Sequence, residues 1–190
     1  MTITPVMDPG GFATEVFFTV LSDADYGFNA VLAAIASQFG ITPFNINFGT
    51  DPTVKTINFA LGSVDPQMLT DNSVGVNFPC MIMFAGKSVN HNKNKGQLFS
   101  GTVHVIVDLY IDFPASRGDQ DFETLSSAVK AAMLLTTNSV YAQSLIPSNA
   151  CYNGGVEVLP MPVVKGGRNW LRTLRHVYLL DVDVPFPTIT

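Results

Sequence analysis

Apolar and polar residues alternate strictly along SGTVHVIVDLYIDFP, residues 100–114. The odd positions after Gly101 are all apolar, whereas the even positions include His104, Asp108 and Asp112. An alternation this long, rich in β-branched residues, predicts a strand with one face in the core. Four residues along a strand separate side chains on the same face by about 13 Å, too far for His104 and Asp108 to share a metal ion. We expect the polar face to meet water or another molecule.

An amphipathic helix is expected over residues 22–40, because apolar residues recur there at intervals of three and four. Ser22 can cap its start, and Gly40 stands where a left-handed residue ends a helix. Residues 1–21 are interpreted as an N-terminal extension or an edge strand, and for residues 12–21 a helix is the alternative to the strand. The core of the domain would then span residues 22–184.

A second amphipathic helix is expected over residues 118–138, capped by Asp119 or Asp121. Between the two helices, an apolar strand at residues 78–85 precedes the alternating strand. The polar segment that joins these strands, residues 87–98, predicts a hairpin with a long tip. Such long tips are often functional.

A second hairpin follows the second helix. Its first strand, residues 156–164, is interrupted by prolines and suits a sheet edge, and its second strand covers residues 170–186. Residues 41–75 are expected to form a loop-rich insertion around one short strand near residues 53–61. The pattern predicts a single α+β domain, with a mostly antiparallel sheet of two hairpins and two amphipathic helices packed on one face.

The amino-acid composition shows that the chain contains few charged residues. Only 13% of its residues are charged, about half of the usual ~25%, while 47% are hydrophobic. A surface of this kind is often covered by partners, although a monomer with a polar, uncharged surface is the alternative. The first residues do not resemble a signal peptide, and no apolar stretch suggests a membrane span. We therefore expect no membrane association.

No pattern in the sequence predicts catalysis, a metal or a cofactor. His91, His104 and His176 lack the spacing of metal ligands, and no phosphate-binding loop or nucleophile elbow occurs. Cys80 and Cys151 belong to no paired motif and are expected to be free thiols in a reducing compartment. The chain is therefore interpreted as a non-enzyme without catalytic residues, metal or cofactor.

The basic residues are segregated, although the net charge is −5. Seven of the ten lie in two short segments, namely Lys87, Lys93 and Lys95, then Lys165, Arg168, Arg172 and Arg175. Arginine and tryptophan are enriched in interfaces. All of these residues except Lys165, together with Trp170, are therefore candidates for contact with a neighbouring subunit or partner. The alternative for the tip is that its lysines only keep it soluble and guard against edge pairing.

Four aspartates lie on predicted strands. Asp108 and Asp112 share one face of the first strand, and Asp181 and Asp183 share one face of the last. A solvated sheet face is one interpretation. The other is an acidic surface that lines a lumen or an interface and repels a passing polyanion such as DNA. The negative net charge argues against tight nucleic-acid binding, which depends on many contacts from Lys and Arg.

The arrangement as a whole resembles the tail terminator proteins of long-tailed bacteriophages. The matching stretches are GTVHVIVDLYIDF, FETLSSAVKAAMLL and WLRTLRHVYLLDVDV, and the resemblance covers roughly residues 22–184 in element order. The N-terminal extension and the long segment 41–75 depart from that pattern. These two departures also suit a related neck protein.

The resemblance implies a structural virion protein that forms a homohexameric ring at the top of the tail. Such a ring caps the tail tube, ends its polymerisation and docks to the head-completion or stopper protein in head–tail joining. DNA passes transiently through the lumen, and assembly takes place in the host cytoplasm. The alternatives are another neck or tail-tube ring protein and, from a different class, a small α+β ligand-binding domain or enzyme.

Overall fold

A computed structural model describes the chain over seven ranges: residues 8–49, 57–61, 76–90, 97–114, 118–145, 153–165 and 169–185. Within these ranges the helices are α1 (Pro9–Ser22), α2 (Phe28–Phe39), α4 (Asp119–Thr137) and α5 (Val140–Leu145). The strands are β1 (Ile57–Leu61), β2 (Val76–Asn90), β3 (Gln97–Pro114), β4 (Asn153–Lys165) and β5 (Asn169–Pro185).

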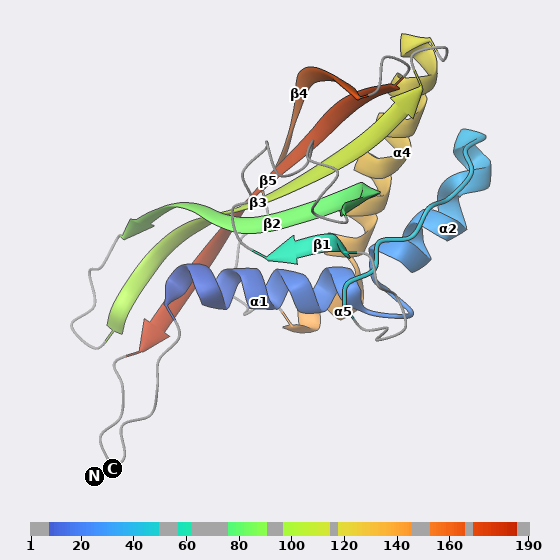
Figure 1. Cartoon of the computed structure of the whole chain (residues 1–190). Helices are drawn as coiled ribbons and strands as arrows, with labels where there is room; N and C mark the ends of the chain where they lie inside the picture. Colours follow the sequence, from blue (N-terminus) through green and yellow to red (C-terminus); the bar gives the residue numbers. More distant parts are fainter. Residues whose placement is uncertain are drawn as a thin grey trace.

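The strands form one sheet in the order β1-β2-β3-β5-β4 (Figure 1). Neighbours are antiparallel from β2 to β4, and β1 runs parallel to β2 at one edge. The fold is therefore α+β, which confirms the class predicted from the sequence. The description as two hairpins with two helices is incomplete, because β1 extends the sheet and the helices α1 and α5 are added to the other two.

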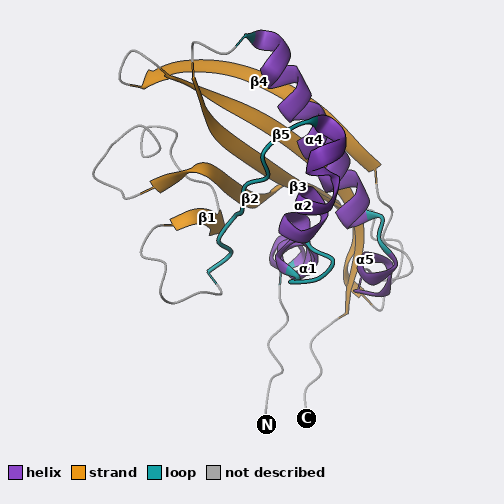
Figure 2. Cartoon of the chain, turned by 90° about the vertical axis from the view of Figure 1, so that its right-hand side faces the viewer, coloured by secondary structure: helices purple, strands orange, loops and turns teal. Residues whose placement is uncertain are grey.

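The core lies between one face of the sheet and the helices, which Figure 2 shows on one side of the strands. In β3 the odd-numbered residues from Val103 to Ile111 are all buried, as the alternation predicts. Val105 pairs with Tyr178 of β5, so the even-numbered residues of β5 share this inner face. Phe17 of α1 packs against Tyr178, with ring centroids 4.9 Å apart.

The edge strand expected within residues 1–21 is wrong, because this segment contains the helix α1. The helix begins after Asp8, whose carboxylate accepts a hydrogen bond from the backbone N–H of Gly11 at 2.9 Å. Phe17 and Leu21 lie one helical turn apart and are at most 1% exposed. The segment is therefore part of the core and not an extension outside it.

The helix α2 begins at Phe28 and not at Ser22, which is the last residue of α1. Gly27 occupies the N-cap position. A Cβ atom at Gly27 would overlap the backbone carbonyl oxygens of Leu21 and Asp23, so the turn between α1 and α2 requires glycine. The two helices are thus separated by a tight turn that the apolar spacing alone does not reveal.

The other predicted helix ends agree in part with the structure. Gly40 follows α2 with a φ of 64°, in the left-handed conformation that was predicted. The helix α4 matches its predicted span, but its N-cap is Gly118 and not Asp119 or Asp121, and no side chain caps it. The predicted helices thus exist, and the errors concern how they begin.

The strand predictions agree with the structure except at their ends. The proline-interrupted strand β4 lies at a sheet edge, as expected, and the short strand near residues 53–61 appears as β1. The predicted tip at residues 87–98 is partly strand, because β2 continues to Asn90 and β3 starts at Gln97. Residues 91–96 lie outside the described residues.

Candidate functional site

The four candidate aspartates share the sheet face that points away from the helices, which we call the outer face. It carries the even-numbered residues of β3 and the odd-numbered residues of β5. The register places Asp181 opposite Thr102, whose hydroxyl donates a hydrogen bond to the Asp181 carboxylate at 2.6 Å, and places Asp183 opposite Ser100. The aspartates of the two strands therefore belong to one surface.

Asp108 is buried within the chain, so the expectation that it faces water or another molecule is wrong. Its side chain is 2% exposed and lies opposite Arg175 of β5. The Nε and Nη2 atoms of Arg175 donate hydrogen bonds to the two carboxylate oxygens of Asp108, each at 2.7 Å. A buried carboxylate needs such a bidentate partner, because burying an unpaired charge is costly. The pair is a structural element of the sheet.

Burial divides the outer face into two ends. Near Asp108, Cys80 and Thr173 are also at most 4% exposed, and one carboxylate oxygen of Asp112 is buried without a hydrogen-bond partner among the described residues. Burial raises the pKa of the free Cys80 thiol to about 11, so this thiol is unreactive at neutral pH. At the other end Asp183 is exposed. The interpretation as an acidic surface therefore suits only the end that carries Asp181 and Asp183.

The arginines of β5 lie on opposite faces of the sheet. Arg172 is on the inner face, where its guanidinium carbon lies 4.4 Å from the centroid of the Phe122 ring of α4. Arg175 is on the outer face, where it forms the ion pair with Asp108. Trp170 belongs to β5, but its side chain and the whole of Arg168 lie outside the described residues. An intermolecular role for these residues stays a prediction, and both described arginines already have contacts within the chain.

The β2–β3 hairpin carries the other basic segment. Lys87 is exposed on β2, while Lys93 and Lys95 belong to the connection that lies outside the described residues. Residues 76–107 contain these three lysines and no aspartate or glutamate. In sequence, the two strands and their connection are therefore basic and carry no acid up to residue 107.

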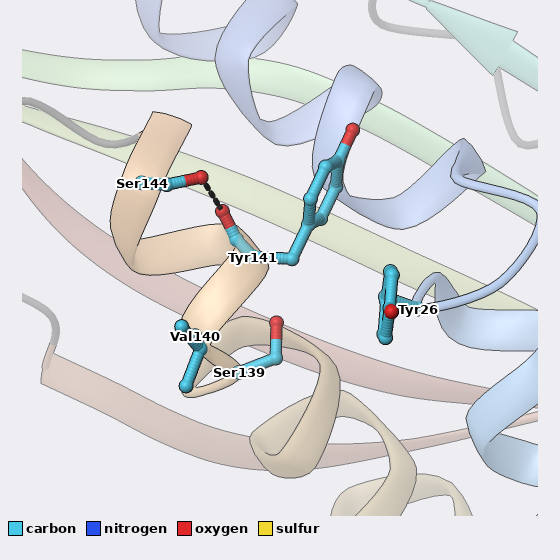
Figure 3. Close-up of a pocket in the computed structure, with 5 residues that line it drawn as sticks. All are labelled: Tyr26, Ser139, Val140, Tyr141 and Ser144. Atoms are coloured by element: carbon cyan, nitrogen blue, oxygen red, sulfur yellow. Dashed lines mark hydrogen bonds between the residues drawn. The ribbon is translucent and has the colours of Figure 1, made fainter.

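A surface that the sequence did not indicate lies where the turn between α1 and α2 meets α5 (Figure 3). Tyr26 is 56% exposed and stacks on Tyr141, with ring centroids 5.6 Å apart, and Val140 is 85% exposed. With Ser139 and Ser144, these residues line a hollow of about 430 Å³. We call these five residues the Tyr26 surface.

Asp23 holds the two halves of the Tyr26 surface together. Its carboxylate accepts backbone N–H groups of Asp25 and Tyr26 at 3.0 and 2.8 Å, and it accepts a hydrogen bond from the Tyr141 side chain. Desolvation raises the pKa of Asp23, but these hydrogen bonds outweigh it and hold the pKa below its usual value. The hydrogen bond to Asp23 is also the main reason why the pKa of Tyr141 is raised. The surface is thus preorganised beside a negative charge.

His176 lies on the inner face and is 3% exposed. Its Nε2 atom has no hydrogen-bond partner in the described part of the chain. Burial, together with the positive charge of Lys130 on α4, lowers the pKa of His176 from 6.5 to about 4. The imidazole is therefore neutral at physiological pH and fills space in the core.

Acidification is expected to destabilise the protein through His176. The unfolded chain binds a proton on this residue near pH 6.5, whereas the folded chain binds it only near pH 4. The free energy of unfolding should therefore fall by about 3 kcal/mol as the pH drops between these two values. Urea unfolding across this range measures the loss. The variant His176→Leu should lack it and His104→Gln should keep it, whereas an equal pH dependence in both variants would assign it to other groups.

The described residues hold no group of three or more His, Cys, Asp or Glu that could bind a metal ion, and His104 and His176 lie on opposite faces of the sheet. None of the helices in these ranges is long and apolar enough to cross a membrane. In comparisons with known proteins, no family model and no curated protein matches the chain. The resemblance to tail terminators therefore stays a prediction.

Proposed function

We propose that the protein is a phage tail terminator, a structural protein that forms a ring on the end of the tail tube. The observation that carries the proposal is the element order α2, β2–β3, α4, β4–β5, with both antiparallel pairs joined through β3 and β5 in one sheet. This is the arrangement on which the resemblance to tail terminators depends. The helices lie on one face of the sheet, and on the other face the end that carries Asp183 is exposed and can make contacts outside the helical layer.

In this role six copies form a closed ring that caps the tube and ends its polymerisation. The ring contacts the tail tube protein on one side and the head-completion protein on the other, and it acts without a cofactor. DNA passes through the lumen without specific binding. The exposed end of the outer face, with Asp181 and Asp183, is the surface we assign to the DNA path, because like charge prevents the DNA from adhering. The protein assembles in the host cytoplasm and remains in the virion.

A related neck or tail-tube ring protein is the second candidate. The helix α1 and the strand β1 are the observations that favour it, because both are additions to the element order on which the resemblance depends. Since α1 supplies buried residues such as Phe17 and Leu21, it is integral to this domain. Such a protein would also form a ring, so the two candidates differ in their partners and not in their assembly.

The mass of the purified protein in solution tests the ring. Six copies of the 20.5 kDa chain have a mass of about 123 kDa, which sedimentation equilibrium distinguishes from one copy. We expect a single closed species whose mass does not grow with protein concentration, because a ring leaves no free end. A species of one chain's mass at all accessible concentrations would contradict the proposed function and favour a monomeric binding domain or enzyme.

A further inference from the structure

We propose that the Tyr26 surface is a docking site for a protein other than this chain, and that the docked segment is apolar and presents an arginine or lysine to the Tyr26 ring. The inference rests on the proposed function, in which the ring binds a different protein on each of its two sides. It assigns one of these contacts to a place in the fold and to a chemistry.

Exposed apolar side chains are concentrated at this corner of the molecule. In the described part of the chain, the large apolar side chains that meet solvent are Tyr26, Leu135, Val140 and Leu145. Three of the four lie at the end of α4 and in α5, and Tyr26 stacks on Tyr141 of α5. Single exposed apolar residues are ordinary, but apolar residues that gather in one place mark a site of protein interaction.

The Tyr26 ring is already held in place for a partner. Asp23 accepts hydrogen bonds from the backbone N–H of Tyr26 and from the Tyr141 side chain, and the two rings stack with 5.6 Å between their centroids. Tyr26 is nevertheless 56% exposed beside the hollow that Figure 3 shows, so it remains open to a partner. Because the ring is fixed before binding, little conformational entropy is lost when a partner packs on it.

Charge indicates that the partner is basic. The first 54 residues contain five acidic residues and no Lys or Arg, and residues 131–156 contain no charged residue. The Tyr26 surface is built from these two parts of the chain, with Asp23 and Asp25 in the same turn as Tyr26. A cation over the Tyr26 ring is attracted both by the face of the ring and by these carboxylates, which would repel an acidic side chain.

The same charges argue against a second copy of this chain as the occupant. The chain has a net charge of −5, so a basic protein is attracted to this surface more strongly than another copy is. The arginines with described side chains are already engaged, since Arg172 packs on Phe122 and Arg175 pairs with Asp108. A ring of six copies would offer a basic protein six equal sites, so each single contact can be weak.

Peptides with one apolar pattern and different charges test the chemistry. The pattern is Gly-Leu-X-Leu-Pro-X-Leu-Gly, in which X is arginine, glutamine or glutamate, and the fluorescence anisotropy of a label on the peptide reports binding to the whole chain. We expect the arginine peptide to bind at least about tenfold more tightly than the glutamine peptide, and the glutamate peptide to bind most weakly. Equal affinities for the arginine and glutamine peptides, or no binding of any peptide at about 1 mM, would overturn the proposal.

Two variants locate the binding on the Tyr26 surface. Ser144→Lys places a positive charge at the hollow near the end of α5, where a cation suits the helix. Because like charges repel, this variant should bind the arginine peptide at least about tenfold more weakly. Tyr26→Leu keeps an apolar side chain but removes the ring beneath the cation, and it should weaken binding about fivefold.

A matched variant controls for the added charge. Ser127→Lys is the same substitution at an exposed position of α4 and should keep the affinity of the unmodified protein. Circular dichroism checks that all variants are folded. If Ser144→Lys and Ser127→Lys weaken binding equally, the peptide binds elsewhere on this acidic protein and the proposed docking site is wrong.

The mass of the protein in solution separates the docking site from the proposed function. A protein that forms rings, but whose Ser144→Lys and Tyr26→Leu variants bind the arginine peptide unchanged, keeps the function and loses the docking site. A monomer that binds this peptide at the Tyr26 surface keeps the docking site and loses the ring. Tyr26→Leu should leave the mass of the ring unchanged, and its dissociation into monomers would show that a second copy occupies the Tyr26 surface instead.

Discussion

Replacing Val105 with aspartate is expected to leave no folded protein. Val105 is fully buried at the centre of β3, opposite Tyr178 on the inner face. An unpaired carboxylate there costs several kcal/mol, against a typical domain stability of about 5–15 kcal/mol. Circular dichroism and the yield of soluble protein measure the effect. His104→Asp, one residue earlier on the outer face, should remain folded, and a Val105→Asp variant that melts like the unmodified protein would show that the inner face is misassigned.

Loss of Arg175 is expected to be more damaging than loss of Asp108. Replacing Arg175 with methionine leaves the carboxylate of Asp108 almost fully buried without its partner and should cost about 3–5 kcal/mol of unfolding free energy. Replacing Asp108 with asparagine should cost about 1–2 kcal/mol, because the side chain of Arg175 is 28% exposed and water can solvate its charge. Urea unfolding of both variants measures the difference.

A double variant distinguishes the ion pair from an intermolecular role of Arg175. Asp108→Leu with Arg175→Met removes both charges and should recover most of the stability that Arg175→Met loses, since a well-packed apolar pair often replaces a buried ion pair without loss. If Arg175→Met keeps the unfolding free energy of the unmodified protein but loses assembly, Arg175 acts at an interface instead. That is the role predicted for it from the clustering of basic residues in the sequence.

The sequence predicts the parts of this fold that depend on local periodicity. The alternation from Val103 to Ile111 is long enough to identify β3 and its buried face, and α4 has both a regular apolar stripe and clear ends. The segment FATEVFFTVL is apolar on most sides, so its pattern does not separate a helix from a strand. Its helical state depends on the packing of Phe17 and Leu21 in the core.

The candidate site is less predictable because it depends on register and on distant segments. Whether Asp108 faces water or an arginine depends on the pairing of β3 with β5, and a shift of one residue would move Arg175 to the other face of the sheet. The Tyr26 surface joins residues that are more than a hundred positions apart in the sequence. The sequence feature that relates to the Tyr26 surface is the absence of charged residues from positions 131–156. A segment without charge normally indicates a part of the core and not a surface.

Electron microscopy of the purified protein mixed with tail tubes of the phage that the proposed function implies tests the central claim most directly. A tail terminator should appear as a ring at one end of each tube, and tubes capped in this way should no longer grow when free tube protein is added. Tubes that remain bare and continue to grow with the unmodified, ring-forming protein would contradict the assignment as a tail terminator.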